Sequence, residues 1–405
     1  MIKKTLNQNI VNSVNGIRLS SVYSGMYNSE RLDLSLIEIQ AGSSVSGVFT
    51  KNNIKSPSVL ICEKNLNKKN PRYLIINSGN ANAGTGKKGY QDAVDYCTFL
   101  SKATLVDINE ILPFSTGIIG ERIKVKEINK SIPLLVDKLN KDSWEDFSKA
   151  ILTTDTCSKI VSKLITLSDE DIIITGVAKG SGMIQPNMAT MLSFVATNLE
   201  INKNTLNNLL NTATNVSYNM ITVDGETSTN DSSILISTGK SNLKYDDLSQ
   251  TDQKIFQKTL NNIYIDLAKK IISDGEGATK FITINVKNID TQSNGKKIAM
   301  SVANSPLVKT ALFAEDPNWG RILSAIGSSE TKISDYTKIE ISFDDILIYK
   351  DGGLHQDYKE DKAKNYLKNK NIIINIDFNI GIINSTVWTT DLSYDYIKIN
   401  ADYRT

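Results

Sequence analysis

The sequence contains a single histidine, His355, and this scarcity limits the catalytic chemistry open to the chain. A Ser-His-Asp or Cys-His arrangement would have to use that one residue, and a metal site with two histidines is excluded. His355 stands in a polar, turn-rich segment, residues 350–357, where a solvated surface side chain is the ordinary outcome. An enzyme built from this sequence must therefore move protons with another group.

Cysteine is also scarce, with only Cys62, Cys97 and Cys157 and no Cys-x-x-Cys pair. An odd count without that spacing argues against a disulfide scaffold or a zinc ribbon and favours a reducing compartment. No apolar run reaches the length of a membrane span, and the N-terminal residues lack the features of a secretory or transit peptide. We expect a cytoplasmic chain that does not enter a membrane.

Charge of one sign is not in excess, because 46 basic and 44 acidic residues leave a net charge of +2. The chain lacks the basic footprint of a nucleic-acid-binding protein, so no nucleic-acid partner is expected. Its 405 residues, 40% of them hydrophobic, suffice for two or three domains with substantial cores.

Hydrophobic periodicity predicts a mixed α/β chain. Residues 282–286, 339–343 and 374–378 alternate like half-buried strands, whereas 73–76 and 171–175 are more continuously apolar and predict central strands. Short helices are predicted near 91–102, 128–139 and 205–215. We expect a large layered α/β domain through about residue 283 and a smaller α/β domain after it. A longer helix is predicted over 252–273, with an apolar stripe of Ile255, Phe256, Leu260, Ile263, Leu267 and Ile271.

One segment is more elaborate than a structural role requires. Residues 179–192 form a glycine-rich, proline-containing approach that ends on Thr190, at the head of an apolar run that predicts a buried strand. A threonine held in this way suits self-cleavage between Ala189 and Thr190. The new α-amine of Thr190, with an ordinary pKa of about 8, would then take the proton of its own hydroxyl without a histidine.

This segment resembles the autocleavage motif of the glutamate N-acetyltransferase/ornithine acetyltransferase family of arginine biosynthesis, in which the second residue of an Ala-Thr pair is the nucleophile. From about residue 47 to the end, further blocks resemble the same family in the same order, whereas the first forty residues match only loosely. These blocks are 77–84 (Asn-Ser-Gly-Asn-Ala-Asn-Ala-Gly), 115–120 (Ser-Thr-Gly-Ile-Ile-Gly), 153–156 (Thr-Thr-Asp-Thr), 227–231 (Thr-Ser-Thr-Asn-Asp), 275–280 (Gly-Glu-Gly-Ala-Thr-Lys), 316–321 (Asp-Pro-Asn-Trp-Gly-Arg) and 389–394 (Thr-Thr-Asp-Leu-Ser-Tyr).

The resemblance implies a layered αββα sandwich as the catalytic domain, residues 1–283, cut between 189 and 190 into α and β fragments. A smaller α/β domain, residues 284–405, follows it, and its tail is expected to close the site. The resemblance also implies an assembly with two copies of each fragment, α2β2.

The same resemblance assigns roles to individual residues. It makes Thr190 the nucleophile, cut free from Ala189, and Thr116 with Gly117 the oxyanion hole. Lys179 has two readings: a surface lysine that closes a strand, or a cation that binds a substrate carboxylate and lowers the pKa of the nearby α-amine. The family pattern favours the second. The implied substrate contacts are Thr153, Lys179, Thr190, Glu276, Asn400 and Thr405.

Two local features depart from simple patterns. Residues 77–86 follow an apolar strand and are rich in glycine, but the Lys-Ser/Thr pair of a phosphate-binding loop is missing, because Lys87 is followed by Lys88. A tight turn between a strand and a helix is predicted there. Where the family commonly has a proline two positions after Thr156, this chain has Ser158, and we expect a local change of the backbone.

The resemblance implies transfer of an acetyl group from N2-acetyl-L-ornithine to L-glutamate through an acetyl-Thr190 intermediate, with neither a metal nor an organic cofactor. Some family members also use acetyl-CoA as a donor, and no residue of this sequence decides that question. Two other hypotheses stay open. A self-processing N-terminal-nucleophile amidase or aminopeptidase would give the acyl group to water, and an unprocessed binding protein would keep Thr190 inert.

Overall fold

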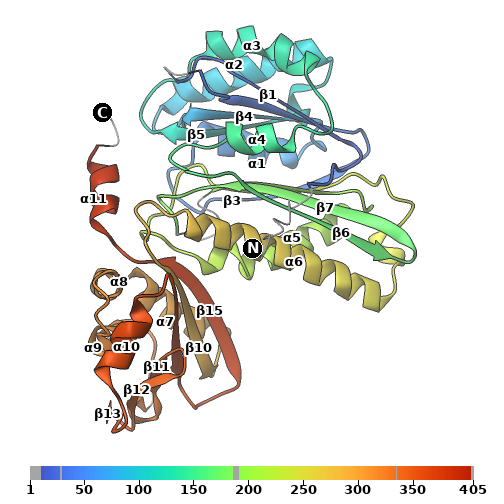
Figure 1. Ribbon diagram of the computed structural model, residues 1–405. Helices are drawn as coiled ribbons and strands as arrows, with labels where there is room; N and C mark the ends of the chain where they lie inside the picture. Colours follow the sequence, from blue (N-terminus) through green and yellow to red (C-terminus); the bar gives the residue numbers. More distant parts are fainter. Residues whose placement is uncertain (1–10, 28–29, 186–190, 334, 403–405) are drawn as a thin grey trace, which may run out of the picture. The chain divides into compact units, whose positions relative to one another are not determined.

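The computed structural model describes residues 11–27, 30–185, 191–333 and 335–402, which form two compact units (Figure 1). The first unit comprises Met1–Gly180, Pro186–Asn219 and Thr227–Ala268. The second comprises Ser181–Gln185, Met220–Glu226 and Lys269–Thr405. The domain boundary predicted at residues 283/284 falls inside β10 (Phe281–Ile289), a strand of the second unit. No helix in the described ranges combines the length and the hydropathy that a membrane span requires.

The first unit contains two sheets. One has the order β1-β2-β4-β5 and consists of β1 (Ile17–Val22), β2 (Leu34–Ile39), β4 (Tyr73–Asn80) and β5 (Ile111–Ile118), with β4 and β5 parallel. The other has the order β3-β9-β8-β7-β6 and consists of β3 (Ser44–Phe49), β9 (Ser232–Ser237), β8 (Leu192–Thr197), β7 (Glu170–Lys179) and β6 (Lys159–Leu167), with β8 and β9 parallel.

The two sheets face each other across one apolar core, in which Ile76 and Phe114 of the first sheet join Phe194 and Ile234 of the second. The rings of Phe114 and Phe194 meet edge to face, 5.1 Å apart. Two helices, α1 (Pro57–Leu66) and α4 (Trp144–Ala150), add side chains to this core. Residues of β4 also enter a second core on the other side of its sheet, and burial on both faces explains why this strand is so continuously apolar.

Helices cover the outer faces of both sheets (Figure 1). α2 (Gly86–Thr104) and α3 (Val125–Asp137) bury their apolar stripes against the first sheet. α5 (Lys203–Asn215) covers β3 and β9, and α6 (Gln250–Ser273) lies over β7, where Gly176 faces Ile263 and Leu267. The predicted αββα sandwich is confirmed.

The long predicted helix is confirmed as α6, but the prediction that Ile255 belongs to its buried apolar stripe is wrong. Phe256, Leu260, Ile263, Leu267 and Ile271 are all buried, whereas Ile255 is 42% exposed. Ile255 lies near the start of α6, where the buried stripe is narrow, whereas further along the helix neighbours such as Ile263 and Tyr264 are both buried.

The second unit is built on a sheet with the order β13-β12-β11-β14-β10-β15. The three predicted alternating strands, β10, β11 and β14, are adjacent in it, and their buried residues are the alternating isoleucines, valine and phenylalanine. His355 follows β13 and is half-buried, with its backbone N–H donating to the carbonyl of Ile348 at 2.7 Å. The bounds are β11 (Glu340–Phe343), β12 (Ile346–Lys350), β13 (Gly353–Leu354), β14 (Asn371–Asp377), β15 (Ile383–Thr390), α7 (Gln292–Asn304), α8 (Pro306–Phe313), α9 (Trp319–Gly327), α10 (Glu360–Leu367) and α11 (Tyr394–Ala401).

A buried lysine makes the stability of this unit sensitive to pH. Lys309 of α8 is 3% exposed, and its ammonium donates to the Thr389 hydroxyl at 2.9 Å and to the Thr390 carbonyl. Burial lowers the pKa of Lys309 to about 7, against the opposing pull of the Asp391 and Asp224 carboxylates. Between pH 7 and the ordinary lysine value near 10.4, the unfolded chain therefore binds one proton more than the folded chain.

The free energy of unfolding should consequently rise with pH in this window, by up to about 1.4 kcal/mol per pH unit from Lys309 alone. Denaturant titrations of the wild type and of Lys309→Met at pH 7, 8 and 9 measure this rise in the free energy of unfolding. Because Met cannot titrate, the difference between the two proteins is the contribution of Lys309. Other groups, such as the buried Cys62 and Cys97 thiols, titrate in both proteins and cancel in the difference. Parallel pH profiles for the two proteins would contradict the prediction.

Candidate active site

The predicted oxyanion residues lie near the end of β5. Thr116 and Gly117 pair in parallel register with Ser78 and Gly79 of β4. Gly117 has a φ of +133°, and a Cβ at this position would lie 2.3 Å from the carbonyl carbon of Gly79. Only glycine fits there, so the end of β4 supports the Thr116-Gly117 backbone directly. The predicted turn between a strand and a helix is confirmed, because β4 ends at Asn80 and α2 begins at Gly86.

Lys179 brings three of the predicted site residues together. It is the last residue of β7, which lies between β6 and β8, and it is 7% exposed. Its ammonium donates to the hydroxyl of Thr153 at 2.7 Å and to that of Thr116 at 3.3 Å. The interpretation of Lys179 as a surface lysine is therefore wrong, because its side chain is buried and bonded to Thr153 and Thr116.

Two charged residues that the sequence reasoning did not single out complete this cluster. Asp155 lies in the loop between α4 and β6, and Lys159 is the first residue of β6; both side chains are fully buried. Lys159 Nζ donates to Asp155 Oδ1 at 2.7 Å, and the Gly180 N–H donates to the same oxygen at 2.6 Å. Lys179 Nζ lies 3.5 Å from Asp155 Oδ2. The sequence feature that could have indicated this pair is the carboxylate inside the 153–156 block, followed four residues later by a lysine.

The electrostatics of the cluster favour an ionised carboxylate. Burial by itself would raise the pKa of Asp155, but the ammonium groups of Lys179 and Lys159 hold it well below the usual carboxyl range. Two cations then surround one anion, and the cluster has a net charge of +1. A buried site with that charge and two hydroxyl groups suits a negatively charged substrate group or a developing oxyanion.

A second group of predicted residues meets within the second unit. Glu276, in the loop after α6, is 9% exposed and accepts from the side-chain amide of Asn400 in α11 at 3.0 Å. Gly182 lies against the same carboxylate, where a Cβ would be 2.3 Å from the Glu276 side chain. The Ser393 hydroxyl ties the start of α11 to the same loop by donating to the Gly277 carbonyl at 2.5 Å. Asn400 is thus held beside Glu276 on a helix, although it lies near the end of the chain.

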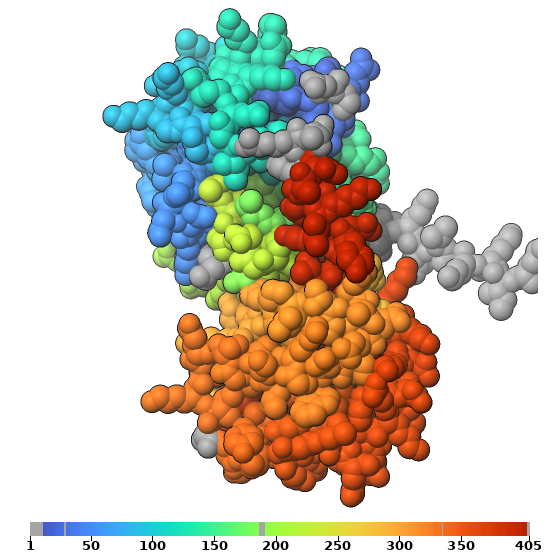
Figure 2. All heavy atoms as spheres, turned by 90° about the vertical axis from the view of Figure 1, so that its left-hand side faces the viewer, coloured from blue at the N-terminus to red at the C-terminus, as the bar shows by residue number. Residues whose placement is uncertain are grey.

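α11 itself stands on the molecular surface, where Figure 2 shows it in dark red. Its first residue, Tyr394, is 79% exposed and Ile397 is 61% exposed. The bonds of Ser393 and Asn400 to the 276–277 loop fix its position within the second unit, together with the edge-to-face contact of the Tyr394 and Phe313 rings at 5.5 Å.

In the predicted autocleavage motif, hydrogen bonds hold the backbone of residues 183–185. The Asp224 carboxylate accepts from the N–H groups of Met183 at 2.7 Å and Ile184 at 2.8 Å. The backbone of Gln185 donates to Glu226 at 2.8 Å. The chain resumes as β8, the predicted buried strand, from Leu192, and all residues of that strand are buried. Ala189, Thr190 and Thr405 lie outside the described residues.

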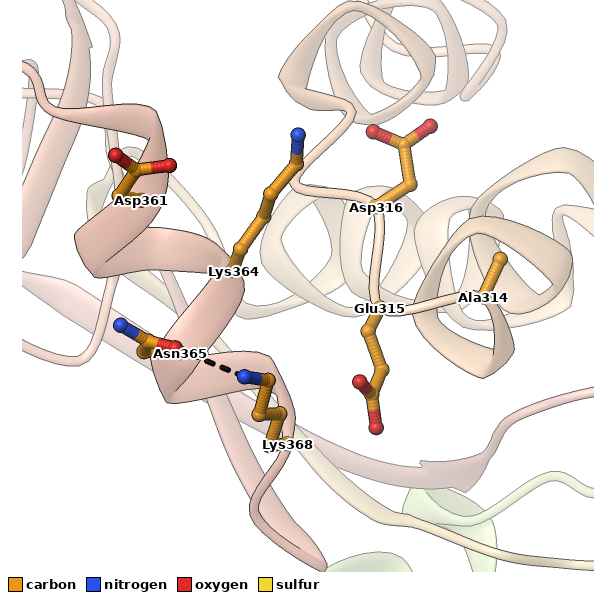
Figure 3. A pocket seen from close by; sticks show the side chains of 7 residues that line it. All are labelled: Ala314, Glu315, Asp316, Asp361, Lys364, Asn365 and Lys368. Carbon is orange, nitrogen blue, oxygen red and sulfur yellow. Dashed lines mark hydrogen bonds between the residues drawn. The ribbon is translucent and has the colours of Figure 1, made fainter.

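A polar pocket of 660 Å³ opens in the second unit between α10 and the turn that joins α8 to α9 (Figure 3). No predicted site residue lines it, and its lysines bond to their own helix: Lys364 to Glu360 at 2.5 Å and Lys368 to Asn365 at 3.0 Å. Within the described ranges, no three His, Cys, Asp or Glu side chains are grouped to hold a metal ion. The pocket is lined by Ala314, Glu315, Asp316, Asp361, Lys364, Asn365 and Lys368.

The αββα unit, with a buried lysine that donates to two threonine hydroxyls, defines the chain as an α/β enzyme. The chain belongs to the ArgJ family, whose model matches residues 18–405. It is 42% identical to the arginine biosynthesis bifunctional protein ArgJ of Colwellia psychrerythraea over 97% of this chain and 96% of that protein. It is 40% identical to the protein of the same name from Pseudomonas fluorescens, over 97% of each chain. A crystal structure of the Bacillus halodurans protein of that name is 37% identical, with a TM-score of 0.49, and covers 53% of this chain and 100% of that chain.

Proposed function

We propose that this ArgJ-family enzyme transfers the acetyl group of N2-acetyl-L-ornithine to L-glutamate in arginine biosynthesis. Thr190 Oγ attacks the acetyl carbonyl while the Thr190 α-amine, freed by cleavage after Ala189, takes the hydroxyl proton and passes it to the departing ornithine amine. The amine of glutamate then attacks acetyl-Thr190, the bond between the acetyl carbon and Thr190 Oγ breaks, and the Thr190 α-amine carries the proton from the attacking amine to Oγ, which releases N-acetyl-L-glutamate. The observation that carries the proposal is the buried contact of Lys179 with Thr116 and Thr153, in a chain of this family.

The proposed roles follow from the chemistry of each group. Thr116 and the Gly117 N–H donate to the tetrahedral oxyanion, and the surplus positive charge around Lys179 binds a substrate carboxylate beside Thr153. Glu276 is buried and carries an acceptor oxygen, so it suits the amino group of ornithine or glutamate. Asn400 orients that carboxylate through its amide, and Thr405 is proposed to complete the contacts.

We further propose that no metal or organic cofactor takes part and that the fragments assemble as α2β2. Acetyl-CoA is the alternative acetyl donor to be tested. The second sheet supports lasting association of the fragments. β3, β6 and β7 precede the cleavage point and β8 and β9 follow it, so separation would break the β7–β8 and β3–β9 pairings. Cys62, Cys97 and Cys157 form no disulfide, which supports a reducing, cytoplasmic compartment.

One incubation distinguishes the proposal from its alternatives. Purified enzyme with N2-acetyl-L-ornithine and L-glutamate should form ornithine and N-acetylglutamate in equal amounts. Ornithine with acetate would identify a hydrolase, and no product would identify a binding protein. The same assay with acetyl-CoA and glutamate, without acetylornithine, decides whether the second donor is used.

Lys179→Met should lower kcat/KM by about 10- to 100-fold, the range of a charge-assisted hydrogen bond. The substitution removes the cation but leaves Asp155 paired with Lys159, so the protein should still fold. Lys163→Met on the adjacent β6, where the side chain is exposed, is the matched control and should keep the wild-type rate. Equal kinetics for the wild type and Lys179→Met would show that Lys179 does not bind substrate.

A further inference from the structure

The two lysines around Asp155 do not share it equally. Lys159 Nζ lies 2.7 Å from Asp155 Oδ1, within hydrogen-bond distance, whereas Lys179 Nζ lies 3.5 Å from Oδ2. Lys159 is therefore the hydrogen-bonded partner of Asp155, whereas Lys179 interacts with the same carboxylate by charge attraction over the longer distance. The hydrogen bonds of the Lys179 ammonium go instead to the Thr153 and Thr116 hydroxyls, even though Lys179 is almost fully buried.

The same carboxylate also fixes the loop that carries Thr153 and the backbone that follows Lys179. Asp155 Oδ1 accepts from the Gly180 N–H at 2.6 Å, and Oδ2 accepts from the Thr153 N–H at 3.2 Å. Lys159 pairs with Ala178 in the β6–β7 ladder, next to Lys179. Asp155 thus holds the residues on both sides of the Lys179 ammonium in place.

The direction of the Thr116 hydroxyl follows from this arrangement. An ammonium group has three N–H donors and no acceptor, so Thr116 Oγ1 and Thr153 Oγ1 must both accept from Lys179. The proton of each hydroxyl is then turned away from Lys179 and remains available to another acceptor. A hydroxyl that accepts from a cation is also a stronger donor, which is what an oxyanion hole requires.

We infer that Asp155 and Lys159 are positioning residues, which hold the Lys179 ammonium against the Thr116 hydroxyl and so turn the hydroxyl proton toward the oxyanion. This inference rests on the proposed acyl-transfer function. It assigns no substrate contact to Asp155 or Lys159: their effect on kcat passes through the Thr116 hydroxyl, and any effect on KM passes through Lys179 and Thr153.

The test is a double-mutant cycle. Asp155→Asn alone would leave two buried ammonium groups without a carboxylate, which endangers folding. The combined variant Asp155→Asn/Lys159→Met removes one charge of each sign and keeps the net charge of +1. It should fold and self-cleave, and we expect its kcat to fall about 10-fold, less than after loss of the Thr116 donor itself, with KM changing less than kcat.

In a Thr116→Ala background, the same pair of substitutions should cause no further loss of kcat, because the hydroxyl through which they act is absent. Losses that multiply in the triple variant, a wild-type kcat in the double variant, or a change confined to KM would each overturn the inference. Asp92→Asn is the control: it breaks the Asp92–Arg122 ion pair on α2 and should lower stability without changing kcat.

The wild-type assay reports separately on the proposed function. If the wild type releases acetate and forms no N-acetylglutamate, the transferase proposal fails, and the same kcat ratios measured on acetate release still test the positioning role. A wild type that forms neither acetate nor N-acetylglutamate would overturn both the transferase proposal and the positioning role of Asp155 and Lys159.

Discussion

Thr190→Ala should remain a single chain of 44.7 kDa and should lack acetyl transfer. Self-cleavage requires the Thr190 hydroxyl to attack the carbonyl of Ala189, which converts the amide to an ester that water opens. Alanine has no hydroxyl, so neither that step nor the later attack on acetylornithine is possible. The wild type should run on a denaturing gel as two fragments of similar size, one ending at Ala189 and the other beginning at Thr190.

Mass spectrometry of the fragments and a coupled assay for ornithine measure both outcomes on the same preparations. Thr190→Ser keeps a hydroxyl, and we expect slower cleavage and partial activity. Loss of one hydroxyl and one methyl group is a modest change, so Thr190→Ala should still fold and should show a cooperative thermal transition. A fully active enzyme that remains one intact chain would rule out the N-terminal-nucleophile mechanism.

The fold could be predicted well where the hydrophobic period was strong. β10, β11 and β14 alternate between buried and partly exposed residues, and α6 has a continuous apolar stripe, so local pattern and tertiary packing agree. Period alone could not show how the strands pair. The chain places β3 in the same sheet as β9, although nearly 190 residues separate them, and only the family resemblance indicated the αββα layers.

The compact units were harder to predict, because the second unit is not continuous in sequence. It includes Ser181–Gln185 and Met220–Glu226, short segments inserted between strands and helices of the first unit. Their attachment depends on backbone hydrogen bonds, from Glu276 to the Ser181 carbonyl at 2.9 Å and from Thr222 to the Trp388 carbonyl at 3.1 Å, and backbone hydrogen bonds leave no signature in side-chain composition. No linker composition marks such a crossing.

In the site, too, sequence motifs identified individual residues, and only the structure showed which of them lie together. Thr116, Thr153 and Lys179 were singled out one by one from motif blocks, and the structure brings their polar atoms within hydrogen-bond distance of one ammonium. The buried Asp155–Lys159 pair was missed, because charged residues ordinarily indicate a solvated surface and only three-dimensional burial reverses that expectation.

Thr116→Ala should slow acetyl transfer by about 10²- to 10³-fold, the usual loss for one oxyanion donor. The hydroxyl acts on charge that develops only in the transition state, so kcat should fall much more than KM rises. The backbone of Thr116 stays in the β4–β5 ladder, and Lys179 retains the Thr153 hydroxyl as an acceptor, so the change should be local. Self-cleavage should slow less, because the carbonyl of Ala189 must take a different pose from that of the acetyl group.

Two further variants of β5 test whether the loss of kcat is due to the Thr116 hydroxyl. Thr116→Ser keeps the hydroxyl and should recover most of kcat. Ser115→Ala changes the neighbouring residue, which points to the opposite face of the strand and contacts the Ser58 hydroxyl at 3.0 Å in the core. It should lower the free energy of unfolding by about 1 kcal/mol, the net contribution of one hydrogen bond, and leave kcat unchanged. If Thr116→Ala kept the wild-type kcat, or if Ser115→Ala lost as much, the oxyanion donor would have to be sought outside Thr116.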